Sequence, residues 1–241
     1  MAPIVARAPR TRLHRMRWLL LAAAVCQAGA LPAQAEAAND IELLGLATAP
    51  AGAALPSGWV TRAVRGQRLP KSQIIDSSDS RYLRLSGAGH AGWFVRELPV
   101  PLLAASPGVL QWTWRATLAP LGADVGAAAT DDATLRVFVV FARHGRFALK
   151  PRAIFYTLAD GVPARDRTDA PFGVRIAGSP ARARDWVRAS ADPFSDYRAI
   201  WGDSPPPIVA IGVMQDTDQT RTPAIGDILT LYWRHGHAAH P

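Results

Sequence analysis

The stretch from residue 205 to residue 233 carries two apolar runs around a polar loop, and this pattern limits the fold more than any other feature. Residues 205–215 and 225–233 are rich in β-branched and aromatic side chains, which fit the pleated, half-buried surface of a sheet. Residues 216–220 between them read Asp-Thr-Asp-Gln-Thr. The pattern predicts two strands joined by a connection too long for a tight turn, with carboxylates and hydroxyls gathered where a sheet ends.

Apolar residues elsewhere alternate with polar ones or cluster in short runs, as strands require. The predicted strands cover residues 82–85, 92–98, 109–118, 131–141, 153–158, 172–177 and 185–188. The run at 131–141 is nearly continuous, which is typical of a central strand covered on both faces. We expect residues 36–80 to form an irregular segment anchored by Trp59, and residues 160–170 to form a charged loop.

One helix is predicted at residues 193–201. Asp192 supplies an N-cap oxygen, Pro193 occupies the first helical position, and Gly202 ends the helix. Its apolar face consists of Phe194, Tyr197 and Trp201, which recur at helical spacing.

Three features together indicate the fold class: the number of short strands, the Gly- and Pro-rich turns, and the single late helix. They predict an all-β, antiparallel β-sandwich of the jelly-roll kind over residues 81–234, followed by a His-containing tail at 235–241. A chain of 241 residues with 49% hydrophobic content is long enough for one domain with a proper core.

The first 35 residues have the organisation of a secretory signal peptide. Five arginines precede the apolar run 18–25, and the small-residue site Ala33-Gln34-Ala35 follows it. We therefore expect cleavage after Ala35 and a periplasmic or secreted protein. No later apolar run is long enough to cross a membrane.

Cleavage would change both the cysteine content and the charge. Cys26 is preceded by Val25 rather than by a small residue, which disfavours a lipid anchor, so the sole cysteine would leave with the signal. The remainder could form no disulfide, thiolate nucleophile or Cys-ligated zinc site. Five of the 27 basic residues and none of the 19 acidic ones precede Ala35, so the formal charge falls from +8 to +3. This charge gives no reason to expect a nucleic-acid partner.

Four stretches share their residues and order with one bacterial family. They are Trp112-Thr-Trp-Arg115; Asp131-Asp-Ala, leading into Arg136-Val-Phe-Val and Phe141; Asp196-Tyr-Arg, followed by Trp201-Gly, Pro205-Pro and Ile208; and Met214-Gln-Asp-Thr-Asp-Gln-Thr220, leading into Gly226-Asp-Ile. From about Tyr82 to Trp233, the chain thereby resembles the family known as domain of unknown function 3047. The resemblance implies an exported β-sandwich similar to carbohydrate-binding jelly rolls, and it implies no activity.

The chain departs from the family pattern in three places. Trp201 stands where the family has Phe, residues 188–193 lack the usual Arg-Asn-Val, and the strand at 154–157 lacks its usual Trp.

Carboxylates at the ends of predicted strands are the main candidates for a site. The candidate ligand or ion residues are Asp131, Asp132, Arg136, Asp216, Asp218, Thr220 and Asp227. One interpretation is a hard-cation site for Ca²⁺, with Asp216 and Asp218 as ligands. A second interpretation is turn chemistry, in which Asp and Thr side chains accept hydrogen bonds from backbone N–H groups and so fix the turns. A third pairs Asp132 or Asp216 with Arg136, because an arginine in a covered strand needs a carboxylate partner.

Three classes of function remain open from the sequence. The first is a non-catalytic binding module for a cell-envelope glycan or a similar ligand, in which exposed aromatic rings would stack on sugars. We predict that Trp112, Trp114 and Trp233 are buried, whereas the pattern does not decide the burial of Trp93 and Trp186. The second is a polysaccharide hydrolase or lyase that uses Asp132, Asp216 or Asp218 as an acid/base pair, although no motif with a built-in mechanism accompanies them. The third is a structural partner in an envelope complex.

Overall fold

A computed structural model describes residues 40–106, 108–143, 151–160, 165–169, 172–179 and 184–235. Only the backbone is described for residues 159–160, 165–169 and 172–179. The predicted signal peptide, including Cys26, and the tail after His235 lie outside the described residues. No helix of the described part of the chain is long and apolar enough to cross a membrane.

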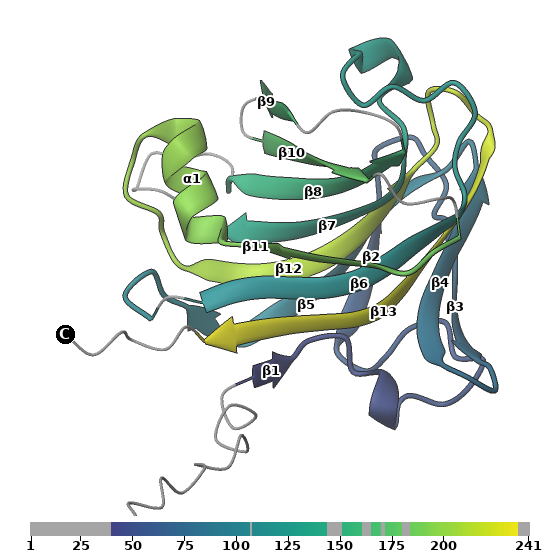
Figure 1. Ribbon diagram of the computed structural model, residues 1–241, viewed down its shortest axis with the longest axis horizontal. Coiled ribbons are helices and arrows are strands. Elements are labelled where there is room, and N and C mark those ends of the chain that lie inside the picture. The colour runs from purple at the N-terminus through teal and green to yellow at the C-terminus, as the bar shows by residue number, and fades with distance from the viewer. Residues whose placement is uncertain are drawn as a thin grey trace, which may run out of the picture. The chain divides into compact units, whose positions relative to one another are not determined.

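The described strands form two sheets that face each other (Figure 1). Sheet A consists, in spatial order, of β11 (Val187–Ala191), β6 (Gly108–Leu118), β13 (Pro223–His235), β4 (Arg81–Ala88) and β3 (Lys71–Asp76), with β1 (Asp40–Glu42) paired to β13. Sheet B consists of β2 (Trp59–Ala63), β5 (Ala91–Leu102), β12 (Ile208–Asp216), β7 (Ala133–Phe141), β8 (Ala153–Asp160), β10 (Phe172–Ser179) and β9 (Arg165–Asp169). The predicted β-sandwich is therefore confirmed.

Neighbouring strands run antiparallel, with one exception among the described pairs. β10 pairs in parallel with β8, from Phe172 opposite Ala153 to Ser179 opposite Asp160. β9 then pairs antiparallel with β10 at the edge of the sheet. The predicted central strand at 131–141 is confirmed, because β7 lies between β12 and β8 and is buried along nearly its whole length.

The core lies between the two sheets. Trp112, Trp114 and Trp233 are at most 1% exposed, so the prediction that they are buried is confirmed. They pack with aliphatic and aromatic side chains of sheet B, such as Leu135, Val137, Phe141, Ile211 and Val213. The sheets approach closely at Gly226, where an added Cβ would overlap the side chain of Leu135.

The predicted helix is confirmed as α1 (Pro193–Trp201). The carboxylate of Asp192 accepts hydrogen bonds from the backbone N–H groups of Phe194 and Ser195, and Gly202 ends the helix in the left-handed conformation. The ring of Tyr197 packs 4.7 Å from that of Phe141, centroid to centroid, and so fixes the helix to the end of β7. Among the described residues, two short 3-10 helices cover Leu46–Thr48 and Ala128–Thr130.

The N-terminal segment differs from the expectation of an irregular chain. Residues 36–80 contain β1, β2 and β3, which pair with β13, β5 and β4 respectively. Trp59 acts as the expected anchor, because its side chain is 7% exposed and its Nε1 donates to the carbonyl of Leu44 at 3.0 Å. The expected charged loop at 160–170 contains β9, and the strand expected at 185–188 begins two residues later, at Val187.

The stretch from 205 to 233 forms the two expected strands, but they belong to different sheets. β12 lies inside sheet B and β13 lies inside sheet A. The loop of residues 217–222 therefore crosses from one sheet to the other at the end of the sandwich opposite α1 (Figure 1). This crossing explains why the connection is longer than a hairpin turn.

Candidate functional site

Three carboxylates converge at the crossing between the sheets. Asp132 immediately precedes β7, Asp216 ends β12, and Asp218 lies in the loop that follows. One carboxylate oxygen from each lies within 4.8 Å of the other two. The expectation that strand-end aspartates meet at one rim therefore holds for these three, and we call them the carboxylate cluster.

Asp132 is the most firmly held member of the carboxylate cluster. It is 1% exposed and accepts hydrogen bonds from the backbone N–H of Gln219 at 3.1 Å and of Thr220 at 2.7 Å. The hydroxyl of Thr220 donates to the same carboxylate at 2.5 Å. Asp132 thus performs the turn chemistry expected of these residues, and it fixes the loop after β12 to the start of β7.

Arg136 is buried in β7, as its position in an apolar strand predicted, and is 5% exposed. Its Nη2 atom lies 2.7 Å from Oδ1 of Asp131 and 2.9 Å from the carbonyl oxygen of the same residue. Oδ2 of Asp216 lies 4.0 Å from this nitrogen. The main partner is therefore Asp131 rather than Asp132 or Asp216, because the carboxylate of Asp132 is turned toward the loop.

Asp216 is buried but only partly satisfied. It is 9% exposed, and its Oδ1 atom is buried without a hydrogen-bond donor among the described residues. Burial raises the pKa of Asp216 from 3.8 to about 7; Arg136 opposes this change, while Asp218 and Asp132 add to it. Oδ1 of Asp218 is likewise buried without a donor in the described part of the chain.

The neighbours of Asp216 in β12 and the loop hold it in this buried position. A register shift between Met214 and Asp216 places a bulge at Gln215, whose side-chain nitrogen donates to the carbonyls of Leu85 and Thr134 at 3.2 Å. Because these carbonyls belong to β4 and β7, Gln215 bridges the two sheets. Thr217 then exchanges hydrogen bonds with the backbone of His90, which fixes the loop on its other side.

Asp227 lies apart from the carboxylate cluster, on the face of sheet A that points away from the core. It is fully buried there by two arginines. Arg84 binds both of its carboxylate oxygens, at 2.7 and 3.0 Å, while Arg115 and Thr117 donate to Oδ2 at 2.7 and 3.0 Å. These hydrogen bonds occupy both oxygens, and they raise the pKa of Arg84 above its usual value. Asp227 is thus a structural carboxylate.

The arginines around Asp227 hold two aromatic rings. The guanidinium carbon of Arg115 lies 4.2 Å from the ring centroid of Trp186 and 4.9 Å from that of Tyr82. The two rings meet edge to face at 5.6 Å. Trp186 is half-buried and held in place by cation–π and aromatic contacts rather than by the core.

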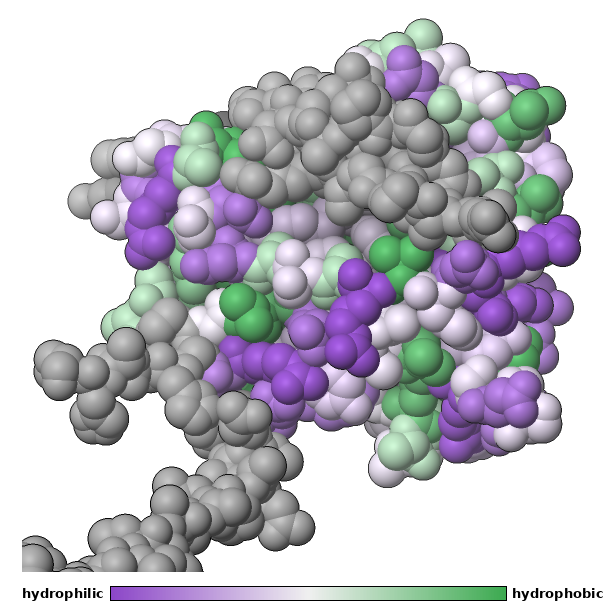
Figure 2. All heavy atoms as spheres, in the orientation of Figure 1, coloured by the Kyte–Doolittle hydropathy of each residue, from purple (hydrophilic) through white to green (hydrophobic). Residues whose placement is uncertain are grey.

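Trp186 stands at the edge of a groove on the same outer face, which we call groove A. Groove A has a volume of about 340 Å³ and crosses three neighbouring strands of sheet A. It is lined by Gln111, Thr113, Trp186, Arg188, Leu229, Thr230, Tyr232 and Arg234. Figure 2 shows hydrophilic side chains gathered over the middle of the face that β11, β6 and β13 form. Groove A thus combines two aromatic rings with hydroxyl, amide and guanidinium groups.

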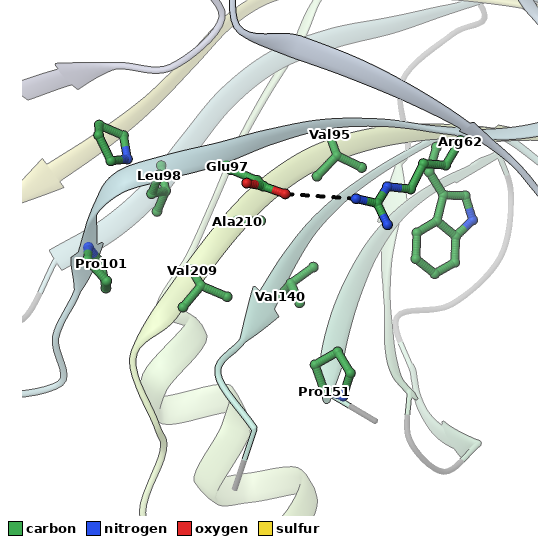
Figure 3. A pocket seen from close by; sticks show the side chains of 11 residues that line it. Arg62, Val95, Glu97, Leu98, Pro101, Val140, Pro151, Val209 and Ala210 are labelled. Atoms are coloured by element: carbon green, nitrogen blue, oxygen red, sulfur yellow. Dashed lines mark ion pairs between the residues drawn. The ribbon is translucent and has the colours of Figure 1, made fainter. Parts of the chain in front are cut away.

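A second groove, groove B, lies on the outer face of sheet B (Figure 3). Its volume is about 540 Å³, and its described lining consists of Arg62, Trp93, Val95, Glu97, Leu98, Pro99, Pro101, Val140, Pro151, Val209 and Ala210. The lining is apolar apart from Arg62 and Glu97, whose charged atoms are 3.8 Å apart at the exposed rim. Trp93 is half-buried here, with its ring packed on Phe138 and Phe155.

Sequence reasoning identified the carboxylates and the two tryptophans of undecided burial, but it missed groove A. The alternation in β6 places Thr113 and Arg115 on the face opposite Trp112 and Trp114. A similar alternation at Thr230, Tyr232 and Arg234 in β13 could have indicated a second polar row. The pairing of β6 with β13 brings these two rows together, and no local pattern in the sequence predicts that pairing.

These features define a β-sandwich protein with buried carboxylates at one end and a polar groove, edged by aromatic rings, on one outer face. The chain belongs to the family described as protein of unknown function (DUF3047), whose model matches residues 57–230. The resemblance seen in the sequence is thereby confirmed. No curated protein matches this sequence.

Solved structures with a similar arrangement of strands are distant. The family 11 carbohydrate-binding module of the cellulase Lic26A-Cel5E of Clostridium thermocellum has 10% identity and a TM-score of 0.45, over 83% of this chain and 98% of that one. The family 11 xylanase of Neocallimastix patriciarum has 9% identity and a TM-score of 0.42, over 82% and 96%. A glycoside hydrolase domain, Endo-D from Streptococcus pneumoniae R6, has 11% identity and a TM-score of 0.40, over 74% and 22%. Nothing about a ligand follows from likenesses this weak.

Proposed function

We propose that this protein is an exported, non-catalytic binding module that holds a glycan of the cell envelope in groove A. The observation that carries the proposal is the ring of Trp186, half-buried at the edge of groove A and fixed by Arg115 and Tyr82. A ring that is already immobilised loses little conformational entropy when a ligand stacks on it.

The other residues that line groove A carry several hydrogen-bonding side chains, which a polyhydroxylated ligand needs. Gln111, Thr113 and Thr230 present amide and hydroxyl groups from two adjacent strands. Arg188 is exposed at the groove, and Arg234 is paired with Asp40 at 3.0 Å. Aromatic and polar groups together distinguish groove A from groove B, whose apolar lining leaves sugar hydroxyls without partners.

Catalysis by the predicted carboxylates is less well supported. Asp132 is engaged by the loop after β12, Asp227 is engaged by two arginines, and Asp216 is 9% exposed. A general acid or base must come within hydrogen-bond reach of its substrate. Because Asp132 and Asp216 are buried, and groove A with its half-buried aromatic ring lies apart from the carboxylate cluster, we favour binding over catalysis.

The proposal is tested by screening the purified protein on an array of bacterial envelope glycans and measuring the affinity for each glycan bound. The variants Trp186→Ala and Arg188→Ala should each weaken binding by about tenfold or more, since each removes a contact worth about 1.4 kcal/mol or more. Thermal melts of both variants confirm that they are folded.

Arg62→Ala is the matched control, because Arg62 is an exposed arginine that lines groove B instead. It should bind the same glycans with unchanged affinity. Loss of binding in Arg62→Ala, with Trp186→Ala unaffected, would move the site to groove B and overturn the proposal. Breakdown of the bound glycan by the wild type would establish the enzyme alternative instead.

A further inference from the structure

We propose that Asp132, Asp216 and Asp218 bind one calcium ion at the crossing between the two sheets. The site is distinct from groove A, which lies on the outer face of sheet A. Its ligands come from two segments more than 80 residues apart in sequence, so the ion would join the loop after β12 to the start of β7.

The first argument is geometric. Ca²⁺ binds oxygen at about 2.4 Å, so two of its ligands can lie up to about 4.8 Å apart. One oxygen from each of the three aspartates satisfies that limit with respect to the other two. The hydrogen bonds to Asp132 from Gln219 and Thr220 fix one of these carboxylates before any ion binds.

The second argument is that two oxygens of the cluster have no donor. Oδ1 of Asp216, a residue that is 9% exposed, and Oδ1 of Asp218 are both hidden from solvent. Neither accepts a hydrogen bond from the described residues. A buried carboxylate oxygen without a donor is costly, and a bound cation removes that cost.

The third argument is the charge within the carboxylate cluster. Of its three members, only Asp216 is paired with a cation among the described residues, and that cation, Arg136, lies 4.0 Å from Oδ2 of Asp216. A divalent cation would compensate the negative charge that the cluster brings together.

The chemistry of the donors selects the ion. All three ligands are carboxylate oxygens, which suit a hard cation and not one that prefers nitrogen or sulfur. Calcium accepts irregular sets of carboxylates, carbonyls and waters, whereas magnesium requires near-ideal octahedral geometry. The irregular loop 217–222 suits calcium, which accepts an irregular set of ligands.

The test is a calorimetric titration of CaCl₂ into the chelator-stripped wild-type protein at pH 7.5, followed by thermal melts with and without the ion. We expect one ion per chain. We also expect Tm to rise by about 5–10 °C at one hundred times Kd. Asp218→Asn should weaken calcium binding by at least about tenfold, and Asp216→Asn should do the same.

Asp79→Asn is the matched control, because it makes the same chemical change at an exposed aspartate in the turn between β3 and β4. It should bind calcium like the wild type. The absence of both heat and a Tm shift in the wild type would overturn the proposal, even if either cluster variant fails to fold. Equal responses to MgCl₂ would overturn the assignment of calcium, and equal losses in Asp79→Asn and Asp218→Asn would show that binding is nonspecific.

Discussion

At the scale of single residues, Asp227, Asp132 and Asp216 differ in how far their buried charge is compensated. Asp227 is neutralised by two arginines, and Asp132 is bound by backbone N–H groups and a hydroxyl. Asp216 has a distant arginine and an oxygen without a donor. Since burying a charge without a partner is expensive, Asp216 is where a proton or an ion would have the greatest effect on stability.

Replacing Arg136 by Met should lower the free energy of unfolding by roughly 3–5 kcal/mol, because Asp131 and Asp216 would lose their shared counter-charge while remaining largely buried. Arg62→Met serves as the control. Arg62 and Glu97 are both exposed, so breaking that pair should cost only about 0–1 kcal/mol. Urea unfolding of the three proteins measures both values, and equal stabilities would show that Arg136 is not held by carboxylates.

The raised pKa of Asp216 predicts a pH dependence of stability in the presence of EDTA. The folded protein holds the proton up to a pKa of about 7, whereas the unfolded chain releases it near 3.8. The folded state therefore binds more protons between these values. Its stability should fall as pH rises from about 4 to about 7, and then level off.

Asp216→Asn should remove this part of the pH dependence. Denaturant unfolding of both proteins at pH 5.5 and pH 8.0 in EDTA gives the comparison. A wild type as stable at pH 8.0 as at pH 5.5, or a variant with the same slope as the wild type, would contradict the assignment to Asp216.

At the scale of elements, local patterns predicted most strands and the helix, but not the sheet to which each strand belongs. β12 and β13 follow from their apolar runs, yet they lie in different sheets. The strands β2 and β9 were missed for a physical reason. Beyond Trp59, β2 is exposed, and β9 reads Arg-Asp-Arg-Thr-Asp. Neither segment has apolar residues at every second position, and each is a strand because it pairs with a neighbouring strand.

The candidate site was predictable only to the level of residue types. Aspartates at strand ends identified the rim where Asp132, Asp216 and Asp218 meet. The main partner of Arg136 is Asp131, only five residues before it, whereas the side chain of Asp132 binds the loop after β12. The contact between Asp132 and that loop joins segments more than 80 residues apart, so no local pattern predicts it.

The N-cap of α1 offers a test at this scale. Asp192→Ala removes the acceptor for two backbone N–H groups and should lower the free energy of unfolding by about 1 kcal/mol. Asp192→Asn should retain most of the stability, because Asn caps helices comparably well. Chemical denaturation distinguishes the two variants, and equal losses would mean that charge rather than capping is at work.

At the scale of the whole molecule, the two outer faces of the sandwich have different chemistry. Sheet A carries groove A with its fixed tryptophan, and sheet B carries the apolar groove B. The carboxylate cluster lies where the chain passes between the sheets, whereas Asp227 is buried on the outer face of sheet A. The sandwich thus separates groove A from the carboxylate cluster at its end.

Export is the remaining prediction at this scale. The order of charged, apolar and small-residue segments predicts a mature N-terminus at Glu36. Intact-mass analysis of the protein recovered from the periplasm or the medium measures it directly. A recovered species that retains Cys26 with an attached lipid would replace this prediction with a membrane anchor.

The position of β13 determines when the protein can fold. The last described strand lies inside sheet A, between β6 and β4, and also pairs with β1 near the other end of the chain. A chain still emerging from a ribosome or a translocation channel lacks the strand that joins the two parts of this sheet. Folding must therefore wait until residues 223–235 have emerged, and the many pairings between distant strands will make it slow.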